Sequence, residues 1–119
     1  MVALEKRMGE YDWERVAADL SAHGNAAIEK LMTPAECAAM AALYPQEEHF
    51  RSHIVMARHG FGNGEYRYFR YPLPDLLGGM RTALYARLAP VANDWNERMG
   101  DPAHYPTAHR DYLQMCGSA

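Results

Sequence analysis

The sequence of 119 residues lacks any apolar segment near the ~20 residues that a membrane-spanning helix requires. The first ten residues carry four charged side chains and no apolar run, unlike a secretory signal peptide. A basic surplus is also missing, because 12 lysines and arginines face 15 acidic residues and the net charge is −3. Proteins that bind phosphate backbones usually have such a surplus. We therefore expect a cytoplasmic protein with neither a membrane nor nucleic acid as partner.

Cysteine is scarce as well. Cys37 and Cys116 are far apart in the chain and lack the spacing of a metal site. Each falls on the apolar side of an expected helix, where a cysteine is usually a small core residue. Neither lies at a helix N-terminus or beside an obvious base, which disfavours cysteine catalysis. Hydrophobic residues make up 49% of the chain and charged residues 23%, as is typical of a folded domain.

Two helices are expected in the first part of the chain. Asp12 is a favourable N-cap and Gly24 suits a left-handed C-cap, so they predict a helix between them. Its apolar side chains recur at helical spacing at Trp13, Val16, Ala17 and Leu20. The segment Thr33-Pro34-Ala35-Glu36 is a capping box with proline at the first helical position. It predicts a second helix, which ends at Pro45.

A β-hairpin is expected next. Residues 53–59 and 65–71 are β-prone, and the glycines and asparagine of residues 60–64 permit the positive φ angles of a connecting loop. Along the second strand, side chains alternate between two faces. One face carries Tyr66, Tyr68 and Arg70, and the other carries Arg67, Phe69 and Tyr71.

A long helix is expected after Pro74, ending near Gly100. Its apolar stripe consists of Leu77, Met80, Leu84, Leu88, Val91 and Trp95. Pro90 lies inside this pattern and should bend the helix or split it in two. A last helix can begin at Thr107. These elements predict an α+β fold, with residues 1–119 forming a single domain or the N-terminal part of a larger one.

One triplet has the residue order of a mononuclear iron site. His109-Arg110-Asp111 matches His-x-Asp, two of the three protein ligands in non-haem iron(II) oxygenases. That motif belongs on a strand, where alternate residues point the same way, whereas this triplet lies in an expected helix. It also requires a further histidine downstream, and no histidine follows His109. We therefore predict no metal ligand and no catalytic residue in this chain.

The hairpin is the most suggestive region for binding. Its flanks concentrate arginine, histidine and tyrosine, and one face of such a sheet could line a pocket in which arginine meets a carboxylate. An ordinary half-exposed hairpin with cross-strand pairs explains the same residues. The pattern alone leaves both interpretations open.

Several segments together carry a family resemblance. They are residues 13–20, 31–37 and 55–69, then Tyr71-Pro72-Leu73-Pro74 and residues 84–93 with Trp95-Asn96. They resemble the opening of a bacterial family of 2-oxoglutarate/iron(II)-dependent dioxygenases that are similar to prolyl hydroxylases. The resemblance extends from about residue 12 to residue 116, and the hairpin segment is its most specific part.

The resemblance implies a longer enzyme whose double-stranded β-helix barrel, with its iron ligands and a basic residue for 2-oxoglutarate, would lie beyond Ala119. Iron(II) and 2-oxoglutarate are thus implied for the full-length family, and no cofactor is expected in this chain. In related prolyl hydroxylases an arginine-containing strand at a similar place borders the substrate. The resemblance therefore makes Arg58, Tyr66 and Tyr68 the candidates for substrate binding.

The expected function is the N-terminal, substrate-shaping portion of such an oxygenase, catalytically incomplete as an isolated chain. The alternative is a stand-alone binding or regulatory protein that reuses this region, with its apolar helix face covered by a protein partner or in a homo-oligomer. A truncated enzyme is a third interpretation. A stable oligomer would favour the binding protein, whereas aggregation would favour truncation.

Overall fold

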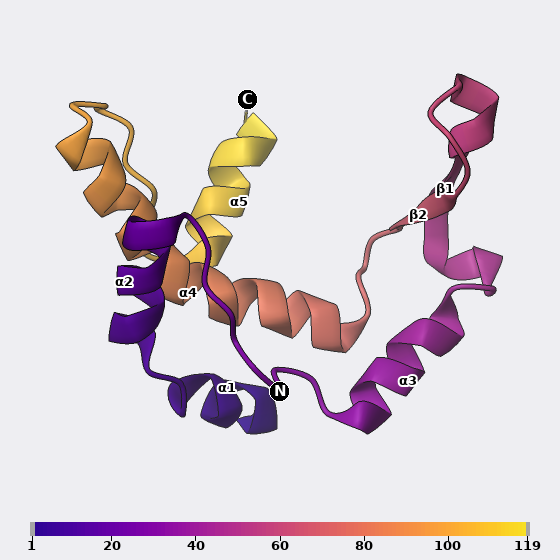
Figure 1. Ribbon diagram of the computed structural model, residues 1–119, viewed down its shortest axis with the longest axis horizontal. Coiled ribbons are helices and arrows are strands. Elements are labelled where there is room, and N and C mark those ends of the chain that lie inside the picture. Colours follow the sequence, from indigo (N-terminus) through magenta and orange to yellow (C-terminus); the bar gives the residue numbers. More distant parts are fainter. Residues whose placement is uncertain (1, 119) are drawn as a thin grey trace. The chain divides into compact units, whose positions relative to one another are not determined.

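The computed structural model describes residues 2–118 and is mixed α+β, as predicted (Figure 1). Its elements are α1 (Val2–Gly9), α2 (Trp13–His23), α3 (Pro34–Leu43), the 3-10 helix η1 (Glu47–His49), β1 (Phe50–Val55), the 3-10 helix η2 (Met56–His59), β2 (Glu65–Phe69), α4 (Asp75–Arg98) and α5 (His109–Ser118). The strands form one antiparallel sheet, and the described residues contain no barrel. Two compact units result: a hairpin unit of residues 32–74, and a helical unit of the residues before 32 and after 74.

The core of the helical unit is small and depends on α1. This helix was not among those predicted from the sequence. Leu4 and Met8 lie one turn apart on α1, and their exposed fractions are 3% and 2%. α1 packs against α4. Leu4 and Met8 are four positions apart, the spacing of residues on one helix face. The three charged residues between them, 5–7, make this apolar pair difficult to recognise in the sequence.

Two hydrogen bonds connect α1 to the segments around α2. The indole Nε1 of Trp13 donates to the carbonyl of Met8 at 2.7 Å, and Nη1 of Arg7 donates to the carbonyl of Leu31 at 2.6 Å. The Arg87 guanidinium of α4 lies 5.4 Å from the Trp13 ring centroid, within cation–π range. These contacts hold the entry of α2 and the segment after it within the helical unit.

The predicted caps of α2 are confirmed. The Asp12 side chain accepts a hydrogen bond from the backbone N–H of Arg15, and Gly24 is left-handed with φ of 75°. The expected apolar face is also confirmed, since Val16 is buried and Trp13 is half-buried. Local capping chemistry therefore determines both ends of this helix.

α4 is one helix of 24 residues with Pro90 inside it, so of the two expected outcomes, a bend or a split, the split does not occur. Proline removes one backbone donor and crowds the preceding turn, which bends a helix without necessarily ending it. Figure 1 shows the axis of α4 changing direction along its length. Ala89 is buried, whereas Leu88 of the expected stripe is 37% exposed. No helix within residues 2–118 combines the length and apolar character needed to cross a membrane.

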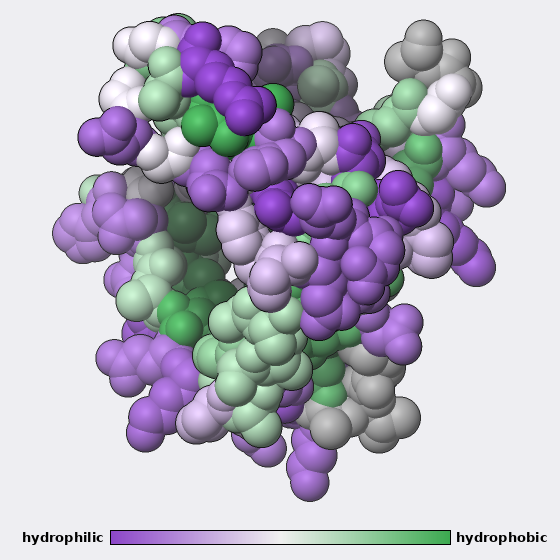
Figure 2. All heavy atoms as spheres, turned by 90° about the vertical axis from the view of Figure 1, so that its right-hand side faces the viewer, coloured by the Kyte–Doolittle hydropathy of each residue, from purple (hydrophilic) through white to green (hydrophobic). Residues whose placement is uncertain are grey.

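In the hairpin unit, α3 begins at the predicted capping box. The Thr33 hydroxyl accepts from the N–H of Glu36, and the Glu36 carboxylate accepts from the N–H of Thr33. No side chain of α3 is buried, and its alanine-rich surface forms the pale green cluster low in Figure 2. The core positions expected for Cys37 and Cys116 are wrong, because both are exposed. Apolar spacing identifies a helix face but does not show whether another element covers it.

The predicted hairpin is present with different bounds. β1 begins at Phe50 and ends at Val55, and the rest of the expected first strand, from Met56 on, forms η2. Gly60 ends η2 in a left-handed conformation with φ of 72°. The register shifts between Phe50 and Ser52, which is the signature of a β-bulge. Because of the bulge, Phe50 and Ser52 pair with the adjacent residues Phe69 and Tyr68, whose side chains lie on opposite faces of β2.

Candidate functional site

Cross-strand pairing gives the hairpin two chemically different faces. His53 pairs with Arg67 and Val55 pairs with Glu65, so these four side chains lie on one face, which we call the inner face. The outer face carries the pairs Ser52–Tyr68 and Ile54–Tyr66. Along β2, the inner-face residues Arg67 and Phe69 are half-buried and the alternating tyrosines are exposed, as the period-two pattern predicts.

Glu65 is the centre of a hydrogen-bonded cluster on the inner face. Its Oε2 accepts from the Tyr44 hydroxyl at 2.9 Å and lies 2.5 Å from Nε2 of His53. The hydrogen bonds from Tyr44 and then from His53 lower the pKa of Glu65, because they stabilise the charged carboxylate. Burial and the neighbouring Glu65 raise the pKa of Tyr44. At neutral pH the Glu65 carboxylate is therefore ionised and the Tyr44 hydroxyl is protonated.

Aromatic rings hold Arg67 in the same cluster. Its guanidinium carbon lies 5.0 Å from the centroid of Tyr44 and 5.6 Å from that of Phe50. Phe50 in turn stacks on Phe69, with ring centroids 4.8 Å apart. Nε of Arg67 is buried and has no hydrogen-bond partner among the described residues. A buried donor of this kind is uncommon in a folded protein.

The outer face presents the predicted substrate residues Tyr66 and Tyr68. Their rings meet edge to face with centroids 5.5 Å apart, and their exposed fractions are 41% and 49%. The Arg51 guanidinium lies 5.5 Å from the Tyr68 centroid and 5.8 Å from that of Tyr71. The structure thus brings two of the three candidates into contact and adds Arg51 to them. Arg58 is exposed on η2, outside both strands.

A second region of interest lies in the helical unit, where aromatic rings join α4 to α5. Tyr85 stacks on Tyr112 and contacts His109, with centroids 5.5 and 5.2 Å apart. The Tyr85 hydroxyl donates to the carbonyl of Pro106 at 2.6 Å. Burial raises the pKa of Tyr85, and the hydrogen bond between Tyr112 and Cys116 raises that of Tyr112. These groups are phenols at neutral pH and serve to pack α5 on α4.

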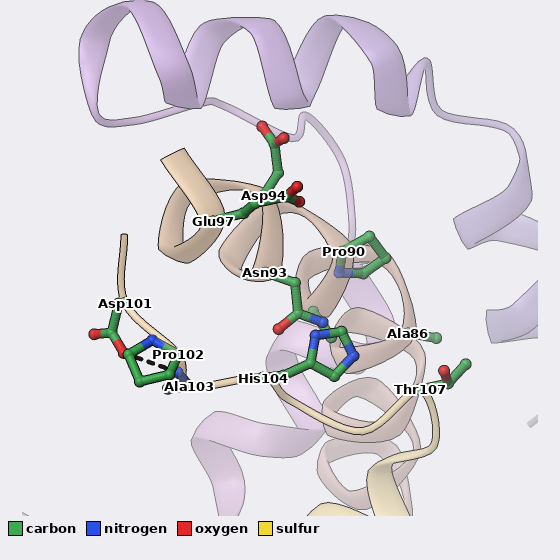
Figure 3. A pocket seen from close by; sticks show the side chains of 11 residues that line it. Ala86, Pro90, Asn93, Asp94, Glu97, Asp101, Pro102, Ala103, His104 and Thr107 are labelled. Carbon is green, nitrogen blue, oxygen red and sulfur yellow. Dashed lines mark hydrogen bonds between the residues drawn. The ribbon is translucent and has the colours of Figure 1, made fainter. Parts of the chain in front are cut away.

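A cavity of about 570 Å³ lies between the second half of α4 and the loop of residues 101–107 (Figure 3). Asn93 and His104 both line it. The Asn93 side chain is fixed by two hydrogen bonds to the backbone of Tyr105, at 2.7 and 3.0 Å. Asp94 pairs with Arg98, and Asp101 accepts from the N–H of Ala103. Three of the polar side chains on this cavity, those of Asn93, Asp94 and Asp101, thus already stabilise the loop and the helix.

The His109-Arg110-Asp111 triplet lies in the first turn of α5. Two positions apart on a helix, His109 and Asp111 point in different directions. Nδ1 of His109 is 2.9 Å from the Thr82 hydroxyl, and its ring contacts Tyr85. Within residues 2–118, the His, Cys, Asp and Glu side chains form no group of three that could hold a metal ion.

Comparison with protein families finds a similarity over part of the chain. Residues 64–119, just under half of the chain, match a family described as "Oxygenase, catalysing oxidative methylation of damaged DNA". None of the curated proteins and none of the solved structures matches the chain. The matched range includes β2, α4 and α5, and with them Tyr66 and Tyr68. It supports a relationship to an oxygenase family and leaves the prolyl-hydroxylase-like assignment a prediction.

The role of Tyr44 and the contact of Arg51 with Tyr68 and Tyr71 are not predicted by the sequence. Tyr44 is the C-cap of α3, and its hydroxyl donates to Glu65 at the start of β2. Arg51 lies at the bulge, before the expected start of the first strand. The glycine-rich loop of residues 60–64 marks the turn between the strands in the sequence, and in the structure Val55 pairs with Glu65 across the sheet. No local pattern marks the bulge that turns Arg51 toward the aromatic rings.

Proposed function

We propose that this chain is the substrate-shaping portion of an iron(II)/2-oxoglutarate-dependent oxygenase, related to prolyl hydroxylases, and that it is catalytically incomplete by itself. The observation that carries the proposal is that the family match includes β2, whose Tyr66 and Tyr68 are exposed side by side. Exposed tyrosines combine a large apolar surface with a polar hydroxyl, as binding surfaces commonly require. The proposed role of the hairpin is to border the substrate.

The residues described do not fit an iron centre. The His109 ring is held by Thr82 and Tyr85, and Asp111 lies two positions further along the same helix. In this proposal the iron and 2-oxoglutarate, which supply oxygen activation in such enzymes, are held by other residues of the complete oxygenase. The contribution of this chain is to bind and orient the substrate. Its location in the cytoplasm is part of the same proposal.

The substrate has two candidate classes. The description of the matching family names damaged DNA, and tyrosine rings can stack on nucleobases. The net charge of −3 favours a polypeptide instead, as does the prolyl-hydroxylase-like resemblance. The two ligands to compare are therefore a single-stranded oligonucleotide with a methylated base and a proline-containing peptide.

Binding measured by fluorescence anisotropy with the full chain tests the proposal. We expect saturable binding of one ligand, weakened about tenfold by Tyr68→Ala and largely retained by Tyr68→Phe, because the ring supplies the contact. Tyr11→Ala is a matched control, since it removes a tyrosine of the helical unit. If neither ligand binds, or if Tyr68→Ala and Tyr11→Ala weaken binding equally, the hairpin does not border the substrate.

The alternative of a stand-alone binding protein stays a prediction. Its homo-oligomer or protein partner would cover the apolar stripe of α4, where Leu88 is exposed. Size-exclusion chromatography with light scattering separates the two functions. A stable oligomer that is lost on Leu88→Glu supports the alternative.

A further inference from the structure

The hairpin is locally basic although the chain as a whole is acidic. Residues 50–71 contain four arginines and one carboxylate, that of Glu65, so their formal charge is 4 − 1 = +3. The whole chain has a net charge of −3. The Glu65 carboxylate is already occupied by Tyr44 and His53. Within residues 50–71 the positive charge is therefore incompletely compensated, and the three acids that bring the hairpin unit of residues 32–74 to a formal charge of 4 − 4 = 0 lie before β1.

A cavity opens among these residues. Its volume is about 180 Å³. Its lining consists of Glu47, Phe50, Arg51, Ser52, His53 and Arg67. Two of the four hairpin arginines thus line one small cavity, together with a hydroxyl and an imidazole. Its size suits a single charged group rather than a large cofactor, because pockets for drug-sized ligands usually have roughly 300–1,000 Å³.

Both arginines of the cavity contact aromatic rings, and Arg67 also interacts with the Tyr44 hydroxyl and with the charge of Glu65. Arg51 contacts Tyr68 and Tyr71, and Arg67 contacts Tyr44 and Phe50. Neither forms an ion pair with a carboxylate within residues 2–118. A ring that contacts the face of a guanidinium leaves the N–H groups at its edge able to donate. Nε of Arg67 is such a donor: it is buried and has no hydrogen-bond acceptor among the described residues.

We propose that this cavity is a subsite for an oxyanion, a phosphate or carboxylate group, held by Arg51 and Arg67. Planar guanidinium groups bind oxyanions through paired charge-assisted hydrogen bonds. Ser52 supplies a further donor at the cavity wall. Glu47 opposes an anion there, so the binding strength reflects two arginines acting against one acid. The subsite lies within the hairpin unit and stands whether or not the chain belongs to an oxygenase.

Titration of the full chain with inorganic phosphate, followed by NMR of the backbone amides at constant ionic strength, tests the subsite. We expect saturable shifts centred on residues 50–53 and 67. Arg51→Gln should weaken phosphate binding about tenfold or more, because a charged hydrogen-bond donor is lost. Glu47→Gln should strengthen it roughly two- to fivefold. The opposite signs of these two variants exclude a general loss of folding as the cause.

Arg70→Gln is the matched control, since it removes the same charge from an exposed residue of the hairpin that does not line the cavity. It should leave phosphate binding within about twofold of the original. A parallel titration with acetate identifies the source of the oxyanion: tighter phosphate binding indicates a phosphate group, and tighter acetate binding a carboxylate. Equal weakening by Arg51→Gln and Arg70→Gln, or no saturable binding of either anion, overturns the proposal.

Discussion

The Tyr44 hydroxyl donates a hydrogen bond of 2.9 Å to Oε2 of Glu65 and so connects the C-cap of α3 to the first residue of β2. These residues are 21 positions apart in the chain. Through this bond and the Arg67 contacts, one tyrosine joins the helix of the hairpin unit to its sheet. Since no side chain of α3 is buried, polar and aromatic contacts of this kind replace part of an ordinary core.

The first prediction concerns pH. The pKa of Glu65 lies below its ordinary value of 4.5, so ionised Glu65 stabilises the fold. That stabilisation is complete above the unfolded-state pKa and is lost as the pH falls through the lower folded-state pKa. We expect the Tm to decrease as the pH falls from neutrality to well below 4.5, and Glu65→Gln to show a smaller decrease. Calorimetry across this range measures both.

The control for this pH experiment is Glu14→Gln, which replaces an exposed carboxylate on α2. It should leave the pH dependence of the Tm close to that of the unaltered chain. Identical pH profiles for Glu65→Gln and Glu14→Gln would show that the Tyr44 and His53 hydrogen bonds contribute nothing to stability.

The second prediction concerns the core of the helical unit. Met8 is 2% exposed, so Met8→Ala leaves a cavity beside α4 and should lower the free energy of unfolding by about 2–5 kcal/mol. Met99, at 71% exposure, provides a control in the same unit: Met99→Ala should change it by less than about 0.5 kcal/mol. Urea denaturation measures both variants. Similar effects for the two methionines would contradict the position of α1 in the core.

The third prediction concerns the capping box of α3. Thr33→Ala removes the acceptor of the Glu36 N–H and should lower the free energy of unfolding by about 1 kcal/mol. Thr107→Ala, which removes the hydroxyl of an exposed threonine outside any helix, is the control and should be nearly neutral. Urea denaturation followed by far-UV circular dichroism measures the difference. A neutral Thr33→Ala would mean that α3 is held by its remaining contacts rather than by its cap.

Local chemistry explains which elements could be predicted from the sequence. The caps formed by Asp12, Gly24 and the Thr33–Glu36 pair follow directly from the sequence, because each capping hydrogen bond joins residues that are close together in the chain. The alternation of exposed and half-buried residues along β2 follows from strand geometry in the same way.

Features that depend on distant partners could not be predicted. The burial of Leu4 and Met8 requires α4, more than 60 residues later, and the exposure of Cys37 depends on whether another element covers its helix face. Of the candidate site, the family resemblance implies Tyr66 and Tyr68, and the alternation of side chains along β2 places both on one face of the strand. The contributions of Tyr44 and Arg51 depend on a cap position and a bulge, and both are set by tertiary packing.

The last prediction concerns the loop that follows α4. Asn93 accepts from the backbone N–H of Tyr105 at 2.7 Å and donates to its carbonyl at 3.0 Å, so one amide satisfies both backbone groups of a half-buried residue. Asn93→Ala leaves both without a protein partner and should lower the free energy of unfolding by about 1–3 kcal/mol. Hydrogen exchange should accelerate at the Tyr105 amide. Asn63→Ala, at an exposed position in the hairpin loop, should change neither quantity. Unchanged exchange at Tyr105 in Asn93→Ala would show that the aromatic contact of Tyr105 with Tyr112 is sufficient to hold the loop.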